Sequence, residues 1–230
     1  YVGASAFTTK AGIHASAIAR DPHTYEHVPP EKVGNRRHVL VSDQGGKANL
    51  LSELSRMGLA IEKNDRRLDT LLAAVKEREA QGYAYEGAAA SFEVLARRTF
   101  GGVPKYFDVE SFHVTVERRH NAVGEQVTVS EAVVKLIVGG ERLLTVGEGN
   151  GPVNALDHAL RKDLGVYRDA IADLELADYK VRILNGGTGA VTRVLIESTD
   201  SSGDSWFTVG VSENIVDASF EALYDSIIYK

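Results

Sequence analysis

Hydrophobic positions recur with a helical period through most of the first hundred residues. The stripes predict amphipathic helices over 45–58, 64–82 and 84–102, with Asn64 as the N-cap of the second and glycines ending each one. Before them, the pattern predicts a short helix over 10–20, one turn over 29–34 and a short strand over 36–43. The N-terminal part is therefore expected to be mainly helical.

After Pro104 the period of the pattern changes from helical to two. Strands are predicted over 112–119, 126–138 and 142–147, followed by a helix over 151–165. The same order then returns, with strands over 175–185, 191–199 and 205–211 and a helix over 213–229. The sequence therefore predicts an α+β fold, in which helical segments precede a duplicated βββα domain with antiparallel sheets and helices on one face.

The duplication is also visible in the residues themselves. GEGNGPVNALDHAL (147–160) aligns without gaps on GVSENIVDASFEAL (210–223), and the matched alanines lie one helical turn apart. We expect subdomains at 1–44 and 45–102 and a third domain at 103–230, with repeats at about 105–165 and 174–230. Neither repeat buries its helix well alone, so we expect the chain to form a homodimer.

Composition excludes several classes of function. The chain has 230 residues, a net charge of −6 and no cysteine, which excludes a thiolate nucleophile and does not favour binding to duplex nucleic acid. No apolar run is long enough for a membrane helix. We therefore expect a cytoplasmic protein that binds neither nucleic acid nor membrane. Because the sequence starts at Tyr1 within an organised segment, we also expect it to be the C-terminal piece of a longer chain.

Residues 23–27, HTYEH, match the H-x-x-E-H pattern of inverted zinc peptidases. That pattern binds metal when a helix puts both histidines on one face, but Pro22 and Pro29 leave at most six helical residues between them. We therefore expect no metal site here.

Two other features are open to more than one interpretation. The glycines of GEGNG (147–151) precede a helix, so the amide groups of Asn150, Gly151 and Val153 are either a site for a small carboxylate or an ordinary turn. His14 lies among small residues in AGIHASAI, where it is either a general acid or base or a structural histidine.

FTTKAGIHASAI and TYEHVPPEKVGNRRHVLVSDQGGKANLL resemble the segment after the catalytic barrel of the 2-isopropylmalate, homocitrate and citramalate synthases. VGNRRHVLVSDQGGKANL is most similar to the citramalate branch, and GNGPVNAL resembles the amino-acid-sensing C-terminal domain of that family. The resemblance implies a barrel elsewhere that holds a divalent metal and condenses acetyl-CoA with a 2-oxo acid, pyruvate in the citramalate branch. It also implies that this chain holds no cofactor and is inactive alone.

The resemblance further implies roles for particular residues. His14 and Tyr25 would enter the neighbouring subunit's active site, His14 for proton transfer and Tyr25 to orient substrate or water, with His23 near the substrate. The effector would be isoleucine in the citramalate branch or leucine in the isopropylmalate branch. Its implied site lies at the dimer interface, near the strand-to-helix junctions, with Tyr179 on a strand that faces the same pocket. The junction residues are Gly149, Asn150, Gly151, Val153 and Asn154.

The second junction, Ser212-Glu213-Asn214, lacks the glycines of the first, so we expect the two halves to differ in function. The alternative to the regulatory region of a synthase is a stand-alone module for amino-acid binding or dimerisation.

Overall fold

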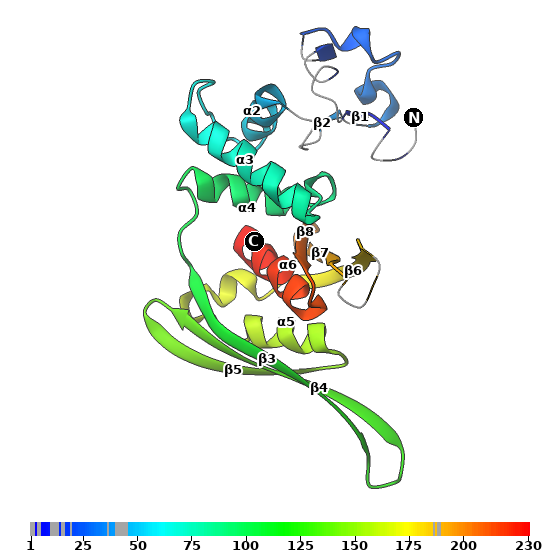
Figure 1. Ribbon diagram of the computed structural model, residues 1–230, viewed down its shortest axis with the longest axis vertical. Helices are drawn as coiled ribbons and strands as arrows, with labels where there is room; N and C mark the ends of the chain where they lie inside the picture. The colour runs from blue at the N-terminus through cyan, green and yellow to red at the C-terminus, as the bar shows by residue number, and fades with distance from the viewer. Residues whose placement is uncertain are drawn as a thin grey trace. The chain divides into compact units, whose positions relative to one another are not determined.

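The computed structural model describes residues 3, 6–9, 14, 17–18, 20–35, 37–39, 46–185, 187 and 190–230. The chain divides into two compact units, 1–102 and 103–230 (Figure 1). Among the described residues, no helix is both long enough and apolar enough to cross a lipid bilayer.

The first unit begins with short elements. β1 (Thr8–Thr9) pairs in parallel with β2 (His38–Val39), and the 3-10 helices η1 (Pro22–Thr24) and η2 (Pro30–Val33) lie between them in sequence. The turn predicted over 29–34 is thus confirmed. Within the helix predicted over 10–20, residues 14, 17, 18 and 20 are helical, and the other positions of that helix lie outside the described residues, as do 36 and 40–43 of the predicted strand.

The three predicted helices of the first unit are present as α2 (Lys47–Arg56), α3 (Arg66–Gln81) and α4 (Ala89–Thr99). Most residues of their predicted stripes are buried, while Leu51, Leu72 and Leu95 are partly exposed. The buried ones are Leu50, Leu54, Leu68, Leu71, Val75, Phe92 and Val94. The predicted cap of α3 was wrong. Asp65, directly before the first helical residue, accepts a hydrogen bond from the Arg67 backbone N at 2.8 Å, a position that Asn64 does not occupy.

The predicted start of α4 at residue 84 was also wrong. Residues Tyr85–Gly87 form a separate 3-10 helix, η3, and Ala88 has φ −141° and ψ 61°, which leave the helical region. Tyr85 is buried and its ring lies 6.0 Å from that of Phe92, edge to face. The sequence pattern predicted one continuous helix, whereas the structure has η3 and α4 as separate helices, with the buried Tyr85 ring packed against α4.

The second unit contains two βββα repeats, which confirms the predicted duplication. β3 (Phe107–His120), β4 (Gln126–Val138) and β5 (Glu141–Gly149) form one antiparallel sheet, followed by α5 (Pro152–Lys162). β6 (Glu175–Ile183), β7 (Thr192–Thr199) and β8 (Ser205–Ser212) form the other, followed by α6 (Ile215–Tyr229). Two short 3-10 helices, η4 (Gly165–Tyr167) and η5 (Asp169–Ile171), connect the repeats.

The residues matched between the repeats lie where the strand and helix backbones touch. A Cβ atom on Gly147 would lie 2.4 Å from the Ala159 backbone N, and one on Gly210 would lie 1.9 Å from the Ala218 carbonyl oxygen. Both distances are far below van der Waals contact, so only glycine fits at either position. The facing alanines are fully buried. The duplicated glycine and alanine positions therefore set the close approach of each helix to its sheet.

The β3–β4 hairpin extends beyond its sheet. β5 ends at Gly149, opposite Ser130, so the more distal residues of β3 and β4 pair only with each other. We call residues 116–130 the arm. Figure 1 shows the arm projecting away from the helices of its own unit. Asn121 closes its turn, because its side-chain oxygen accepts from the backbone N of Val123 at 3.1 Å and of Glu125 at 2.9 Å.

Candidate functional site

His14 and Tyr25, eleven residues apart in sequence, are in contact in the first unit. Their ring centroids lie 4.5 Å apart, with an angle of 34° between the planes. Both residues are exposed, Tyr25 to 50%. The structure therefore brings the two expected catalytic side chains together and presents them to solvent, where groups from outside this unit can reach them.

The position of Tyr25 follows from local structure. Asp21 precedes Pro22, and its carboxylate accepts from the His23 backbone N at 3.0 Å, which fixes the start of η1. The Tyr25 backbone N then donates to the Pro22 carbonyl at 3.1 Å and closes the turn. His23 is exposed on the same turn.

Glu26 and Arg37 support this turn, and sequence reasoning did not identify either of them. The Arg37 Nε and Nη2 atoms donate to the two oxygens of Glu26 at 2.6 and 2.5 Å, and the Glu26 side chain is 8% exposed. The hydrogen bond to Glu26 raises the pKa of Arg37 above its usual value. This bidentate ion pair connects Glu26, the residue after Tyr25, to Arg37, which lies just before β2.

The H-x-x-E-H stretch has the short helix predicted for it. η1 covers only three residues, and Glu26 is bound to Arg37. Among the residues that the structure describes, no group of three or more histidine, aspartate or glutamate side chains is placed to hold a metal ion.

At the junction of β5 and α5, the chain forms hydrogen bonds with itself. The Asn150 backbone N donates to Asn154 Oδ1 at 3.2 Å, so one of the three amide groups expected to face a ligand already has a partner. Asn154 Nδ2 lies 3.3 Å from His158 Nε2, and His158 Nδ1 lies 2.7 Å from the Glu148 carbonyl. Gly151 is the N-cap of α5 and makes no side-chain cap.

Gly149 has a packing role at this junction, because a Cβ there would lie 2.5 Å from Asn154 Oδ1. Val153, in the first turn of α5, is partly exposed. Gly149, Asn150 and Asn154 thus form one compact turn, with Gly151 and Val153 directly beside it in sequence.

Tyr179 lies in the other repeat, on β6. Its hydroxyl forms a 2.8 Å hydrogen bond with Ser219 Oγ of α6, and partial burial raises its pKa. The second junction differs from the first in its cap: Asn214 Oδ1 accepts from the Val216 backbone N at 2.8 Å. One helix thus begins at an uncapped glycine and the other at a side-chain cap.

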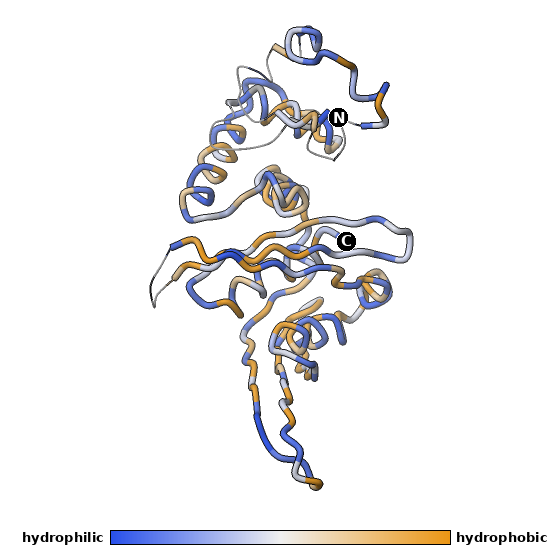
Figure 2. Tube along the Cα trace, turned by 90° about the vertical axis from the view of Figure 1, so that its right-hand side faces the viewer, coloured by the Kyte–Doolittle hydropathy of each residue, from blue (hydrophilic) through white to orange (hydrophobic). Residues whose placement is uncertain are grey.

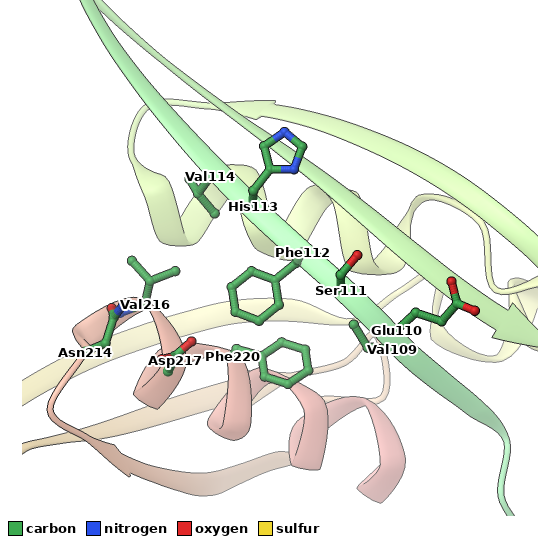
Figure 3. A pocket seen from close by; sticks show the side chains of 10 residues that line it. All are labelled: Val109, Glu110, Ser111, Phe112, His113, Val114, Asn214, Val216, Asp217 and Phe220. Carbon is green, nitrogen blue, oxygen red and sulfur yellow. The ribbon is translucent and has the colours of Figure 1, made fainter.

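The second unit contains a groove of about 510 Å³ between β3 and the start of α6. Figure 3 shows Phe112 pointing toward Phe220, with Val216 and Asp217 beside them and His113 directed away. The two phenylalanine rings stack with centroids 4.7 Å apart. The groove is open and mixes apolar walls with carboxylates.

A smaller apolar pocket of about 150 Å³ lies by η4 and η5, and sequence patterns gave no signal for it. Leu164, Ile171 and Ile227 line it together with aromatic rings, and Lys230 completes the lining. The Lys230 ammonium group pairs with Asp200 at 2.6 Å and with Asp173 at 3.3 Å. The volume and the apolar lining of this pocket suit a small branched aliphatic side chain.

Comparisons with known proteins match the whole length of the chain. Residues 1–82 match the family model described as homocitrate synthase post-HMGL domain-like, and residues 86–230 match the LeuA allosteric (dimerisation) domain. The chain is 49% identical to an (R)-citramalate synthase of Geobacter sulfurreducens and 47% identical to one of Aquifex aeolicus, each over 100% of this chain and 43% of the relative. It is 31% identical to a probable 2-isopropylmalate synthase of Methanopyrus kandleri, over 96% of this chain and 42% of the relative.

The chain thus spans less than half the length of these relatives. The LeuA match covers the two βββα repeats and more than half of the residues. The chain therefore belongs to the family of the LeuA allosteric (dimerisation) domain.

Proposed function

We propose that this chain is the C-terminal region of an (R)-citramalate synthase, an acyltransferase that condenses acetyl-CoA with pyruvate. The contact between His14 and Tyr25 is the observation that carries the catalytic part of this proposal. The relatives that share 47–49% identity with this chain are named citramalate synthases, which supports the citramalate branch over the isopropylmalate branch.

In this reaction, the acetyl methyl group loses a proton, the enolate attacks the ketone, and water hydrolyses the thioester. From one subunit, His14 would transfer a proton near the reacting carbonyl or thioester in the neighbouring subunit, and the Tyr25 hydroxyl would orient substrate or water. The exposure of both side chains suits this role. We place the divalent metal in the catalytic barrel outside this chain, so the chain alone would be inactive.

Full-length enzyme carrying His14→Ala, Tyr25→Phe or His23→Ala tests the catalytic roles. General acid–base catalysis contributes roughly 10²–10⁴-fold, so His14→Ala should reduce kcat by about that factor while inhibition by the effector persists. His27→Ala is the matched control, because His27 is also exposed on this segment. Equal kcat values for His14→Ala and His27→Ala would contradict a catalytic role for His14.

We further propose that the second unit binds isoleucine as a feedback effector. The proposed residues are those at the α5 junction and on β6: Gly149, Asn150, Gly151, Val153, Asn154 and Tyr179. The partial positive charge at the start of α5 would favour the effector's carboxylate. The apolar pocket near Ile171 is a second candidate place for the effector, because its lining suits the aliphatic side chain.

Calorimetric titration of the 230-residue chain with isoleucine, leucine and valine tests this proposal. Asn154→Ala removes the junction's central side chain, while Ala170→Met adds bulk to an exposed residue that lines the apolar pocket. Loss of binding in one variant alone identifies the site. Heat with leucine only would assign the chain to the isopropylmalate branch, and no heat with any of the three would leave a dimerisation module.

We also propose that the chain forms a homodimer in the cytoplasm. The family description supports dimerisation, and each repeat has only one helix to pack on its three-stranded sheet. Sedimentation velocity over a range of concentrations would measure this association directly.

A further inference from the structure

We propose that the arm of one copy of this chain docks in the groove beside α6 of a second copy. This inference rests on the homodimer of the proposed function and names the surface that forms it. The arm supplies an apolar and basic face, and the groove supplies apolar walls with carboxylates. Each copy would give its arm and receive the arm of the other.

The face of the arm follows from the strand register. Alternate residues of a strand share a face, so Val114, Val116 and Arg118 continue the face on which Phe112 points toward α6 (Figure 3). Val116 remains 54% exposed, and Arg118 is exposed. Figure 2 shows a polar stretch along one strand of the arm and a hydrophobic position at its tip. Beyond Val114, this face extends past the helices of its own unit (Figure 1).

Arg119 lies on the opposite face of the same strand. It pairs across the hairpin with Val127, whereas Arg118 pairs with Thr128. Both arginines are exposed, and neither forms an ion pair within the part of the chain that the structure describes. These two adjacent, exposed arginines therefore distinguish the two faces of the arm.

The groove offers the complementary chemistry. Val216 and the stacked rings of Phe112 and Phe220 form its apolar walls. Asp217, which also lines the groove, is exposed on the first turn of α6. Across the described ranges, Asp217 has no ion-pair partner. An apolar groove with a free carboxylate at its edge matches an arm with exposed valine and a free arginine.

A second copy is the occupant that best satisfies these features. The groove is lined by β3, the strand that continues into the arm, and by α6, so donor and acceptor surfaces lie next to each other on one unit. A two-fold axis near this surface would then place each arm on the other copy's groove and repeat the same contact twice. The unpaired outer edge of β3 borders the groove, and such edges are generally covered.

Charge reversal in the 230-residue chain tests the docking. Arg118→Glu would set a carboxylate against Asp217 of the other copy in both contacts, and we expect the dimer Kd to rise by about tenfold or more. Arg119→Glu is the matched control and should change Kd by less than about threefold. Asp217→Arg alone should weaken the dimer as Arg118→Glu does. Sedimentation velocity measures each Kd.

Mixing the two weakened variants gives the decisive result. In a dimer of Arg118→Glu with Asp217→Arg, one contact joins the two introduced charges and the other is unchanged, so this heterodimer should recover the wild-type affinity. Native mass spectrometry measures the heterodimer fraction, and Trp206 fluorescence checks that each variant is folded. Equal effects of Arg118→Glu and Arg119→Glu, or no preference for the heterodimer, would overturn the docking while leaving the homodimer intact. A monomeric wild-type chain would overturn both.

Discussion

Substitution Gly210→Ala should destabilise the second unit strongly, because β8 and α6 touch through their backbones at this glycine. The added Cβ would lie 1.9 Å from the Ala218 carbonyl oxygen, whereas carbon–oxygen contacts are ordinarily about 3.3 Å or longer. The helix must therefore move away by about 1 Å or more, and a gap of that size forfeits roughly a quarter to a half of each dispersion contact across it.

The buried face of α6 sets the magnitude of this effect. Ala218, Ala222, Leu223 and Ile227 all lie on it and are at most 6% exposed. Overpacking typically costs about 1–3 kcal/mol, and a backbone contact has no side chain that can rotate away. Restriction of the unfolded chain by alanine offsets about 0.4–1 kcal/mol of this cost. We expect a net decrease of about 2 kcal/mol in the free energy of unfolding, from the upper end of the first range less the offset.

Urea unfolding followed by tryptophan fluorescence measures this change. The chain has one tryptophan, Trp206, which is buried on β8 and donates to Ser226 Oγ at 3.0 Å, so the signal reports the second unit. The midpoint should fall by about 1–2 M. Gly151→Ala is the control, because nothing lies within 4 Å of its added Cβ and its φ is −161°. A midpoint for Gly210→Ala equal to that of Gly151→Ala would refute the reasoning.

Two further predictions concern ion pairs of the second unit. Hydrogen bonds from Lys230 and from the Ser202 hydroxyl lower the pKa of Asp200 from 3.8 to about 2, so the stability from its ionised form is lost as pH falls through that range. The Tm difference between wild type and Asp200→Asn should therefore shrink between about pH 5 and pH 2 in scanning calorimetry, and a constant difference would contradict this. Arg161→Met should cost about 3–5 kcal/mol in urea unfolding, because Arg161 pairs with Asp157, whose side chain is 6% exposed, and donates to the Leu174 carbonyl. A loss below about 1 kcal/mol would show that Asp157 finds other partners.

The sequence alone determined the elements of the second unit and their duplication. Alternation of period two defined the strands, and the matched glycines and alanines of 147–160 and 210–223 revealed the repeat. The strand signal is readable because it depends on residues near one another in sequence, and the repeat is readable because similar residues recur at one fixed offset. The matched glycines also reflect a steric constraint, because at Gly147 and Gly210 the helix backbone lies too close to the strand for any Cβ atom.

The tertiary structure decided what depends on contacts between distant residues. The sequence placed His14 and Tyr25 in one site only through a family resemblance, whereas their ring contact and the Glu26–Arg37 pair arise from chain folding that no local pattern encodes. The apolar pocket near Ile171 gathers residues from three separate segments, so its lining has no period in sequence. Periodicity indicates which face of an element is buried. Which other element packs on that face, and whether a face such as that of the arm stays exposed, depends on how whole elements pack in three dimensions.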